Sequence, residues 1–288
     1  MLYSNGVTPI DPTGRKDAAP LPAIIYGTAW KQEATAEAVG NAVTAGYRGI
    51  DTANQKKHYR EDYLGDALAN LSGLRIRREE FFLQSKYTFQ DGQDHRLPYD
   101  PNDDFGKQVE SSFAGSLKNL HTDYLDSYLL HGPSASDGMA EADWEAWEAM
   151  EGLHRSGRAR RIGVSNVGLQ HLRDLGGAKT QPMVVQNRCY AIRGWDEAVR
   201  EHCLANGIVY QGFSLLTANP QVVGDRRVAA IARRLKATPA QVVFRFAAKL
   251  GILPLTGTTD PRHMKEDLAA LGLDLSAAEV AEIRSISR

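Results

Sequence analysis

Short apolar or β-branched runs alternate along the chain with stretches of helical periodicity. The runs are typical of buried strands, and they cover residues 23–29, 47–53, 81–88, 126–133, 161–167, 183–190, 207–214 and 251–258. Between them, apolar residues recur every three or four positions, as in ATAEAVGNAVTAG and DWEAWEAMEGLHRSG, which predicts amphipathic helices. Thr238-Pro239 and Asp260-Pro261 each place an N-cap residue before a proline at the first helical position.

Eight strands that alternate with helices fit either a closed barrel or an open doubly wound sheet. An open sheet that binds a dinucleotide carries G-x-G-x-x-G after a strand, but this chain contains no G-x-G and no P-loop pattern. The sequence therefore predicts an α/β fold, a single (β/α)8 TIM barrel over residues 1–288. Residues 1–22, rich in Pro, Gly, Asp and Asn, form an irregular lead-in.

The balance of charge argues against nucleic acid or an anionic membrane as the main partner. Lys and Arg number 34 and Asp and Glu number 35, for a net charge of −1. No apolar stretch is long enough for a signal peptide or a membrane span. Cys189 and Cys203 have no metal-ligand spacing, so we expect no metal site and two reduced thiols, with a disulfide as the alternative. These features predict a cytoplasmic protein.

Chemically reactive side chains occur where several predicted strands end. In a (β/α)8 barrel the functional residues gather at the carboxyl ends of the strands. Strands two, three and four end at Asp51, Lys86 and His131. Each has an ordinary structural interpretation, respectively a helix cap, a solvated lysine and a core histidine. Together they place a carboxylate, an ammonium and an imidazole at one rim, which indicates a catalytic site.

The motifs at these positions resemble those of the aldo-keto reductase family. GYRGIDTA, FFLQSKYT, YLDSYLLHGP, RIGVSNV and VVQNRCY occur in the family's order, and the resemblance covers about residues 23–287. The most specific segments are Tyr124 to Pro133 and Gly163 to Asn166. The resemblance implies an NAD(P)H-dependent oxidoreductase that reduces aldehydes or ketones to alcohols.

By this resemblance Asp51, Lys86 and His131 are catalytic, and a tyrosine after Asp51 donates the proton. Hydride transfer to a carbonyl carbon leaves an alkoxide, so a positioned acid lowers the barrier. A phenol has an ordinary pKa near 10, and an adjacent ammonium is expected to lower it. Asp51 would keep Lys86 protonated, and His131 would orient the carbonyl oxygen.

The position of the tyrosine departs from the family pattern. Family members have it five residues after the aspartate, where this chain has Lys56. Glu61 matches a family glutamate, so the preceding loop is about two residues longer here. We assign Tyr59 as the acid and Tyr63, one turn further on, to helix packing.

The resemblance also implies a nicotinamide cofactor. Ser165, Asn166 and Gln186 match positions that hydrogen-bond the nicotinamide carboxamide, and Phe213 takes the place of a tyrosine that stacks on the ring, with core packing as its alternative role. The remaining predicted cofactor contacts line the pyrophosphate and the adenosine: Ser214, Leu216, Thr256, Thr258, Arg262 and Glu266.

Two positions near the end of the chain bear on the choice between NADP and NAD. Members that bind the 2′-phosphate of NADP carry Pro-Lys-Ser at the end of strand eight and an arginine soon after. This chain has Leu255 in place of that lysine and His263 in place of that arginine, while Arg262 and Lys265 lie close enough to compensate. We expect NADPH, with NAD possible.

The expected substrate is a small carbonyl compound. Residues 90–106 are polar and predict a loop over the pocket mouth, and the candidates for an apolar lining are Trp30, Phe89, Tyr99 and Trp195. The protein is expected to be a monomer or a weak homo-oligomer.

Two other functions fit the same residues. One is a Schiff-base enzyme of the aldolase type with Lys86 as nucleophile, although a neighbouring Asp51 would raise the lysine pKa when that chemistry needs it lowered. The other is a non-catalytic nicotinamide-binding sensor that keeps Ser165, Asn166 and Gln186.

Overall fold

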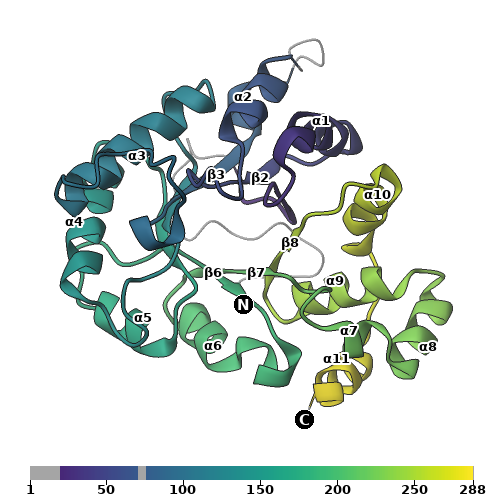
Figure 1. The fold of residues 1–288 in the computed structure, drawn as a ribbon. Helices are drawn as coiled ribbons and strands as arrows, with labels where there is room; N and C mark the ends of the chain where they lie inside the picture. Colours follow the sequence, from purple (N-terminus) through teal and green to yellow (C-terminus); the bar gives the residue numbers. More distant parts are fainter. Residues whose placement is uncertain (1–19, 71–75, 288) are drawn as a thin grey trace.

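A closed barrel of parallel strands forms the centre of the molecule. The computed structural model describes residues 20–70 and 76–287. Neighbouring strands pair in chain order, and β1 also pairs with β8, which closes the barrel (Figure 1). The strands are β1 (Ile25–Gly27), β2 (Gly49–Asp51), β3 (Phe82–Tyr87), β4 (Ser127–Leu130), β5 (Ile162–Ser165), β6 (Val184–Arg188), β7 (Val209–Phe213) and β8 (Leu253–Thr256). Each lies inside one of the predicted runs, so the (β/α)8 barrel is confirmed.

Helices surround the barrel, as Figure 1 shows along its axis. They are α1 (Thr35–Ala45), α2 (Glu61–Asn70), α3 (Phe105–Asn119), α4 (Glu141–Arg155), α5 (Leu169–Leu175), α6 (Glu197–Ala205), α7 (Pro220–Val223), α8 (Arg226–Leu235), α9 (Pro239–Lys249), α10 (Pro261–Ala270) and α11 (Ala277–Arg284). Thr238 caps α9 and Asp260 caps α10 through side-chain oxygens, with proline at the start of each helix as predicted. None of the described helices is long and apolar enough to cross a membrane.

The barrel interior changes from apolar to polar along the strands. Successive side chains of a strand point to opposite faces, so every second residue enters the interior. An apolar cluster fills the end where the strands begin, and it includes Ile25, Phe82, Leu129, Val184, Val209 and Leu253. Two residues further along β3, β6 and β7 lie Gln84, Gln186 and Gln211. The barrel is therefore closed by an apolar plug at one end and carries polar groups toward the other.

A second and larger apolar core lies between the strands and the helices. It buries Ile50 of β2, Phe113 of α3 and Trp147 of α4. Cys189 and Cys203 are both buried and free, as expected. Of the predicted lead-in, residues 1–19 lie outside the described residues, and residues 20–22 have no regular secondary structure.

Candidate active site

A cavity of about 1100 Å³ opens at the carboxyl ends of the strands. Most of the residues predicted for the site line it: Asp51, Tyr59, His131, Ser165, Asn166, Gln186, Phe213, Ser214, Leu216, Thr256, Thr258 and Glu266. Lys86 and Arg262 are not among its lining residues. Lys86 still belongs to the site because it is bonded to Asp51, whereas Arg262 does not reach the cavity.

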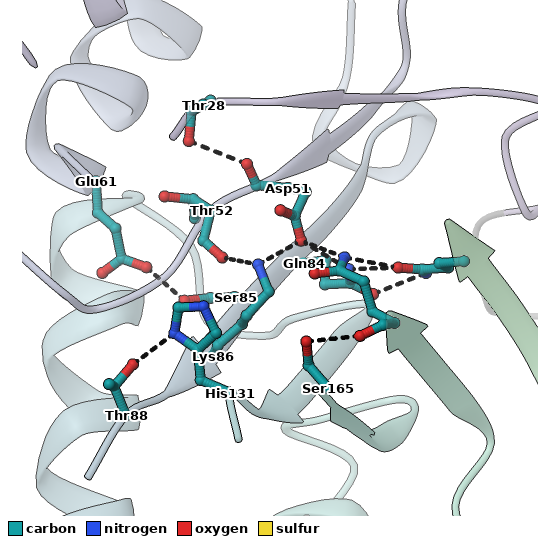
Figure 2. Close-up of polar contacts among 12 residues, drawn as sticks. Thr28, Asp51, Thr52, Glu61, Gln84, Ser85, Lys86, Thr88, His131 and Ser165 are labelled. Atoms are coloured by element: carbon teal, nitrogen blue, oxygen red, sulfur yellow. Dashed lines mark hydrogen bonds and ion pairs between the residues drawn. The ribbon is translucent and has the colours of Figure 1, made fainter. Parts of the chain in front are cut away.

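Asp51 and Lys86 form a buried ion pair. Lys86 Nζ lies 2.7 Å from Asp51 Oδ1 and donates a second hydrogen bond of 2.7 Å to the Thr52 carbonyl (Figure 2). Burial lowers the pKa of Lys86, and the negative charge of Asp51 opposes this shift. As expected, Asp51 acts to raise the pKa of Lys86, but the lowering by desolvation is larger.

Three glutamines that the sequence analysis did not single out as a group support Asp51. Gln84 and Gln186 donate hydrogen bonds of 2.7 and 3.0 Å to the same Asp51 Oδ1 that binds Lys86. Gln84 and Gln211 exchange two amide bonds of 2.8 and 3.0 Å, and Gln186 donates to Gln211 at 2.9 Å. We call Gln84, Gln186 and Gln211 the glutamine belt. Because β3 and β7 are not neighbours in the barrel, these bonds cross its interior. The sequence signal that could have found Gln84 is its position two residues before Lys86, which puts both side chains on the same face of β3.

Tyr59 reaches the catalytic end of the cavity from the loop between β2 and α2. Its ring centroid lies 5.4 Å from Lys86 Nζ and 5.9 Å from the His131 ring centroid. The loop is longer than the family pattern but well anchored, because buried Gln55 donates to the Gly92 carbonyl at 2.6 Å and its own carbonyl accepts from the backbone of Tyr59 at 2.9 Å. The predicted tyrosine therefore lies beside the other side chains that were predicted to be catalytic.

The pKa of Tyr59 differs from the sequence-based expectation. Burial raises it, and the Asp51 carboxylate adds to the rise. The neighbouring Lys86 ammonium was expected to lower the pKa of Tyr59, but desolvation has the larger effect. The phenol is consequently held in its protonated form, which a proton donor needs before the reaction.

His131 faces the same cavity as a neutral imidazole. Its Nδ1 lies 2.7 Å from Thr88 Oγ1, so Nε2 is the ring nitrogen left for a ligand (Figure 2). Burial lowers the pKa of His131 well below its ordinary value, and the positive charges of Lys86 and His58 act in the same direction. If Thr88 donates to Nδ1, the neutral ring carries its proton on Nε2 and can donate a hydrogen bond.

The predicted nicotinamide residues form one wall of the cavity. Ser165 Oγ donates to the Gln186 carbonyl at 2.7 Å, and Asn166 Nδ2 donates to the His131 carbonyl at 2.8 Å. Asn166 has a φ of 58°, a left-handed conformation that turns the chain sharply as β5 ends. The Phe213 ring lies in the wall with the Arg188 guanidinium 5.4 Å from its centroid. A flat ring beside amide and hydroxyl groups fits a nicotinamide carboxamide. Arg188, which the sequence analysis missed, follows Gln186 by two residues.

The end of the cavity at β8 has a different chemical character. Thr256 Oγ1 donates to Asp267 Oδ2 at 2.6 Å, and burial raises the pKa of Asp267 to about 6. Lys31 Nζ donates to the Gly257 carbonyl at 2.9 Å, and burial lowers the pKa of Lys31 to about 8. The predicted contact of Arg262 with a cofactor has no support here, because its guanidinium lies 3.6 Å from Asp260 Oδ2.

Two of the four predicted substrate-side aromatic residues line the mouth. Trp30 is 71% exposed, and its ring centroid lies 3.7 Å from that of His58; Phe89 also lines the cavity. Tyr99 instead donates its hydroxyl to the Thr88 carbonyl, and Trp195 packs on Phe246 in the core. Sequence position alone did not separate these two packing residues from the lining.

Comparison with known proteins agrees with this geometry. The model of the Aldo/keto reductase family matches residues 23–220. The chain is 32% identical to an aldo-keto reductase of Mycolicibacterium vanbaalenii over 91% of this chain and 87% of that protein. It is 30% identical to glyoxal reductase of Bacillus subtilis, over 89% and 84% respectively. The solved structure of aldose reductase from Schistosoma japonicum matches with a TM-score of 0.82 and 25% identity, over 98% of this chain and 92% of that one. The chain therefore belongs to the aldo/keto reductase family and is an oxidoreductase that acts on carbonyl compounds.

Proposed function

We propose that the protein reduces aldehydes or ketones to alcohols with a nicotinamide dinucleotide, and that Tyr59 is the proton donor. The observation that carries the proposal is the convergence of Tyr59, His131 and the Asp51–Lys86 pair at one end of the cavity. When bound, the reduced dinucleotide supplies the hydride. Glyoxal reductase of Bacillus subtilis, a relative, carries an aldehyde in its name, which supports small aldehydes as the first substrates to test.

Each catalytic side chain has a separate task in this proposal. His131 Nε2 donates to the carbonyl oxygen and polarises the C=O bond. Tyr59 transfers its phenolic proton to that oxygen as negative charge develops on it. Lys86 stabilises the resulting phenolate, and Asp51 holds the ammonium in place with the help of the glutamine belt.

The wall at β5 to β7 is proposed to hold the nicotinamide. Ser165, Asn166 and the side-chain amide oxygen of Gln186 present polar atoms for its carboxamide, and Phe213 presents a ring for stacking. The family resemblance favours NADPH, and NADH is the alternative. On composition and charge we further propose a cytoplasmic protein that acts as a monomer or a weak homo-oligomer.

A turnover assay with a matched pair of variants tests the proposal. We expect the wild type to oxidise NADPH or NADH in the presence of small aldehydes. Tyr59→Phe should lower kcat by a factor of about 100 to 10,000, because general acid catalysis contributes that much. Tyr63→Phe is the control, since Tyr63 stacks on Arg60 outside the cavity lining. Equal turnover of Tyr59→Phe and the wild type would reject Tyr59 as the acid.

The alternatives have less support. A Schiff base needs a lysine amine that meets the substrate, but the Lys86 side chain is 1% exposed and already bonded to Asp51 and Thr52. A borohydride-trapped substrate adduct on Lys86 would favour that alternative. A sensor without activity would bind the dinucleotide and fail the turnover assay with every carbonyl compound.

A further inference from the structure

The end of the cavity farthest along the chain, at β8 and α10, is acidic. Its lining includes Thr256, Gly257, Thr258, His263, Glu266 and Asp267. Two of these carry carboxylates, and among the described residues this part of the lining has no lysine or arginine. The cavity is continuous from His131 to Glu266, so a dinucleotide with its nicotinamide at Phe213 would extend its adenosine toward these carboxylates.

Asp267 is held in a fixed position within this wall. It is 4% exposed, and the Thr256 hydroxyl engages only its Oδ2. Glu266, the preceding residue, is half-buried, and its backbone carbonyl accepts from Gln241 Nε2 at 2.9 Å. Both side chains are acceptors on well-packed positions of α10, so this wall is preorganised for a donor such as a hydroxyl group.

Most of the nearby basic side chains lie outside the cavity lining. Arg262 and His263 lie 3.6 and 3.8 Å from the Asp260 carboxylate; Arg262 is outside the lining, whereas His263 is part of it. Lys31 is 8% exposed, donates to the Gly257 carbonyl and is not among the lining residues. Lys265 is exposed and does not line the cavity. Among the described residues, a bound anion at this end would therefore face the carboxylates of Glu266 and Asp267 and the imidazole of His263, with no lysine or arginine in this part of the lining.

We propose that this end of the cavity binds the adenosine ribose as a free diol and rejects a 2′-phosphate, so that NADH binds more tightly than NADPH. The inference rests on the proposed function, because it takes the cavity as a nicotinamide dinucleotide site. A carboxylate accepts hydrogen bonds from ribose hydroxyls in NAD sites, whereas a 2′-phosphate needs a cationic partner. A phosphate monoester carries a charge of about −1.5 to −2 at pH 7, and here it would face Glu266 and Asp267, with no lysine or arginine among the described lining residues at this end to compensate. The preference is opposite to the one that the family resemblance favours.

Direct binding measures this preference without any carbonyl substrate. Purified protein is titrated with NADH and with NADPH at pH 7.5, and binding is followed by calorimetry and tryptophan fluorescence. At low ionic strength the Kd for NADH should be at least about tenfold lower than the Kd for NADPH. Added salt should reduce this difference in Kd, because it screens repulsion between like charges. Equal affinities, tighter NADPH, or binding of neither dinucleotide would overturn the proposal.

Charge-removing variants locate the effect. Glu266→Gln and Asp267→Asn keep the side-chain shape, and each should tighten NADPH binding several-fold while leaving or weakening that of NADH. Glu201→Gln is the control, because Glu201 is an exposed carboxylate on α6 outside the lining. If neither variant changes the ratio of the Kd values for NADPH and NADH, or if the control changes it equally, Glu266 and Asp267 are not the source of the preference. NADH binding without any carbonyl turnover would instead reject the proposed function and keep this inference.

Discussion

The Asp51–Lys86 pair is one buried contact on which both stability and the proposed chemistry depend. Lys86 is fully buried, and its charge is compensated by one carboxylate and one carbonyl. Breaking a buried pair on one side is costly because the remaining charge has no partner. Retaining the pair is therefore a structural requirement as well as part of the proposed mechanism.

A double-mutant cycle tests this at the residue scale. Asp51→Asn and Lys86→Met should each lower the free energy of unfolding by about 3 kcal/mol or more, since each leaves its partner buried without compensation. The double variant should lose less than the sum by at least about 1 kcal/mol. Urea denaturation of all four proteins gives the coupling. Strict additivity would mean that the two charges do not stabilise each other.

At the scale of elements, close packing of α2 on α3 depends on a glycine. A Cβ built on Gly65 of α2 would lie 2.0 Å from the backbone carbonyl oxygen of Asn119, at the end of α3. That contact is far shorter than any van der Waals distance and involves backbone, so one helix would have to move. α2 begins at Glu61, two residues after Tyr59, and its displacement would shift the loop that carries Tyr59.

A pair of glycine substitutions separates packing from helix propensity. Gly65→Ala should destabilise the protein by about 1–3 kcal/mol through overpacking. Gly40→Ala in α1 is the matched change, because a Cβ there meets nothing within 4 Å. It should stabilise by about 0.5–1 kcal/mol, since alanine is the better helix former. Thermal unfolding measures both, and a stabilising Gly65→Ala would contradict the packing argument.

The whole molecule carries a buried carboxyl that couples folding to pH. Glu61 is 3% exposed and accepts hydrogen bonds from the hydroxyls of Ser85 and Ser116. Burial raises its pKa from 4.5 to about 7. The folded state therefore binds more protons than the unfolded state between these values. The stability from this group is complete below pH 4.5 and is lost as pH rises through about 7.

Glu61→Gln should remove this pH dependence. Relative to the wild type, the variant should become more stable as pH rises from 4.5 to 7, by up to about 3 kcal/mol across the window. Urea denaturation at pH 5 and pH 8 measures the difference for each protein. If wild type and variant change in parallel between these two values, the pKa of Glu61 is not raised by folding.

The local sequence pattern was enough to determine the fold class and most of the candidate site. Strand and helix positions follow from periodicity and caps, which depend on neighbouring residues. Once the strands close into a barrel, residues at their carboxyl ends must share one rim. Asp51, Lys86 and His131 could therefore be grouped from the sequence alone. Tyr59 could be chosen because Glu61 fixed the register of the loop.

The contacts across the barrel and the charge around the cavity were decided by the tertiary structure alone. Gln84 and Gln211 meet because β3 and β7 face each other through the interior, and no local pattern encodes that pairing. Arg188, which was not predicted for the site, lines the cavity, whereas Arg262, which was predicted as a cofactor contact, does not. The direction of the Tyr59 pKa shift likewise depends on burial. Such properties arise from groups distant in sequence, whose distances are set only when the barrel closes.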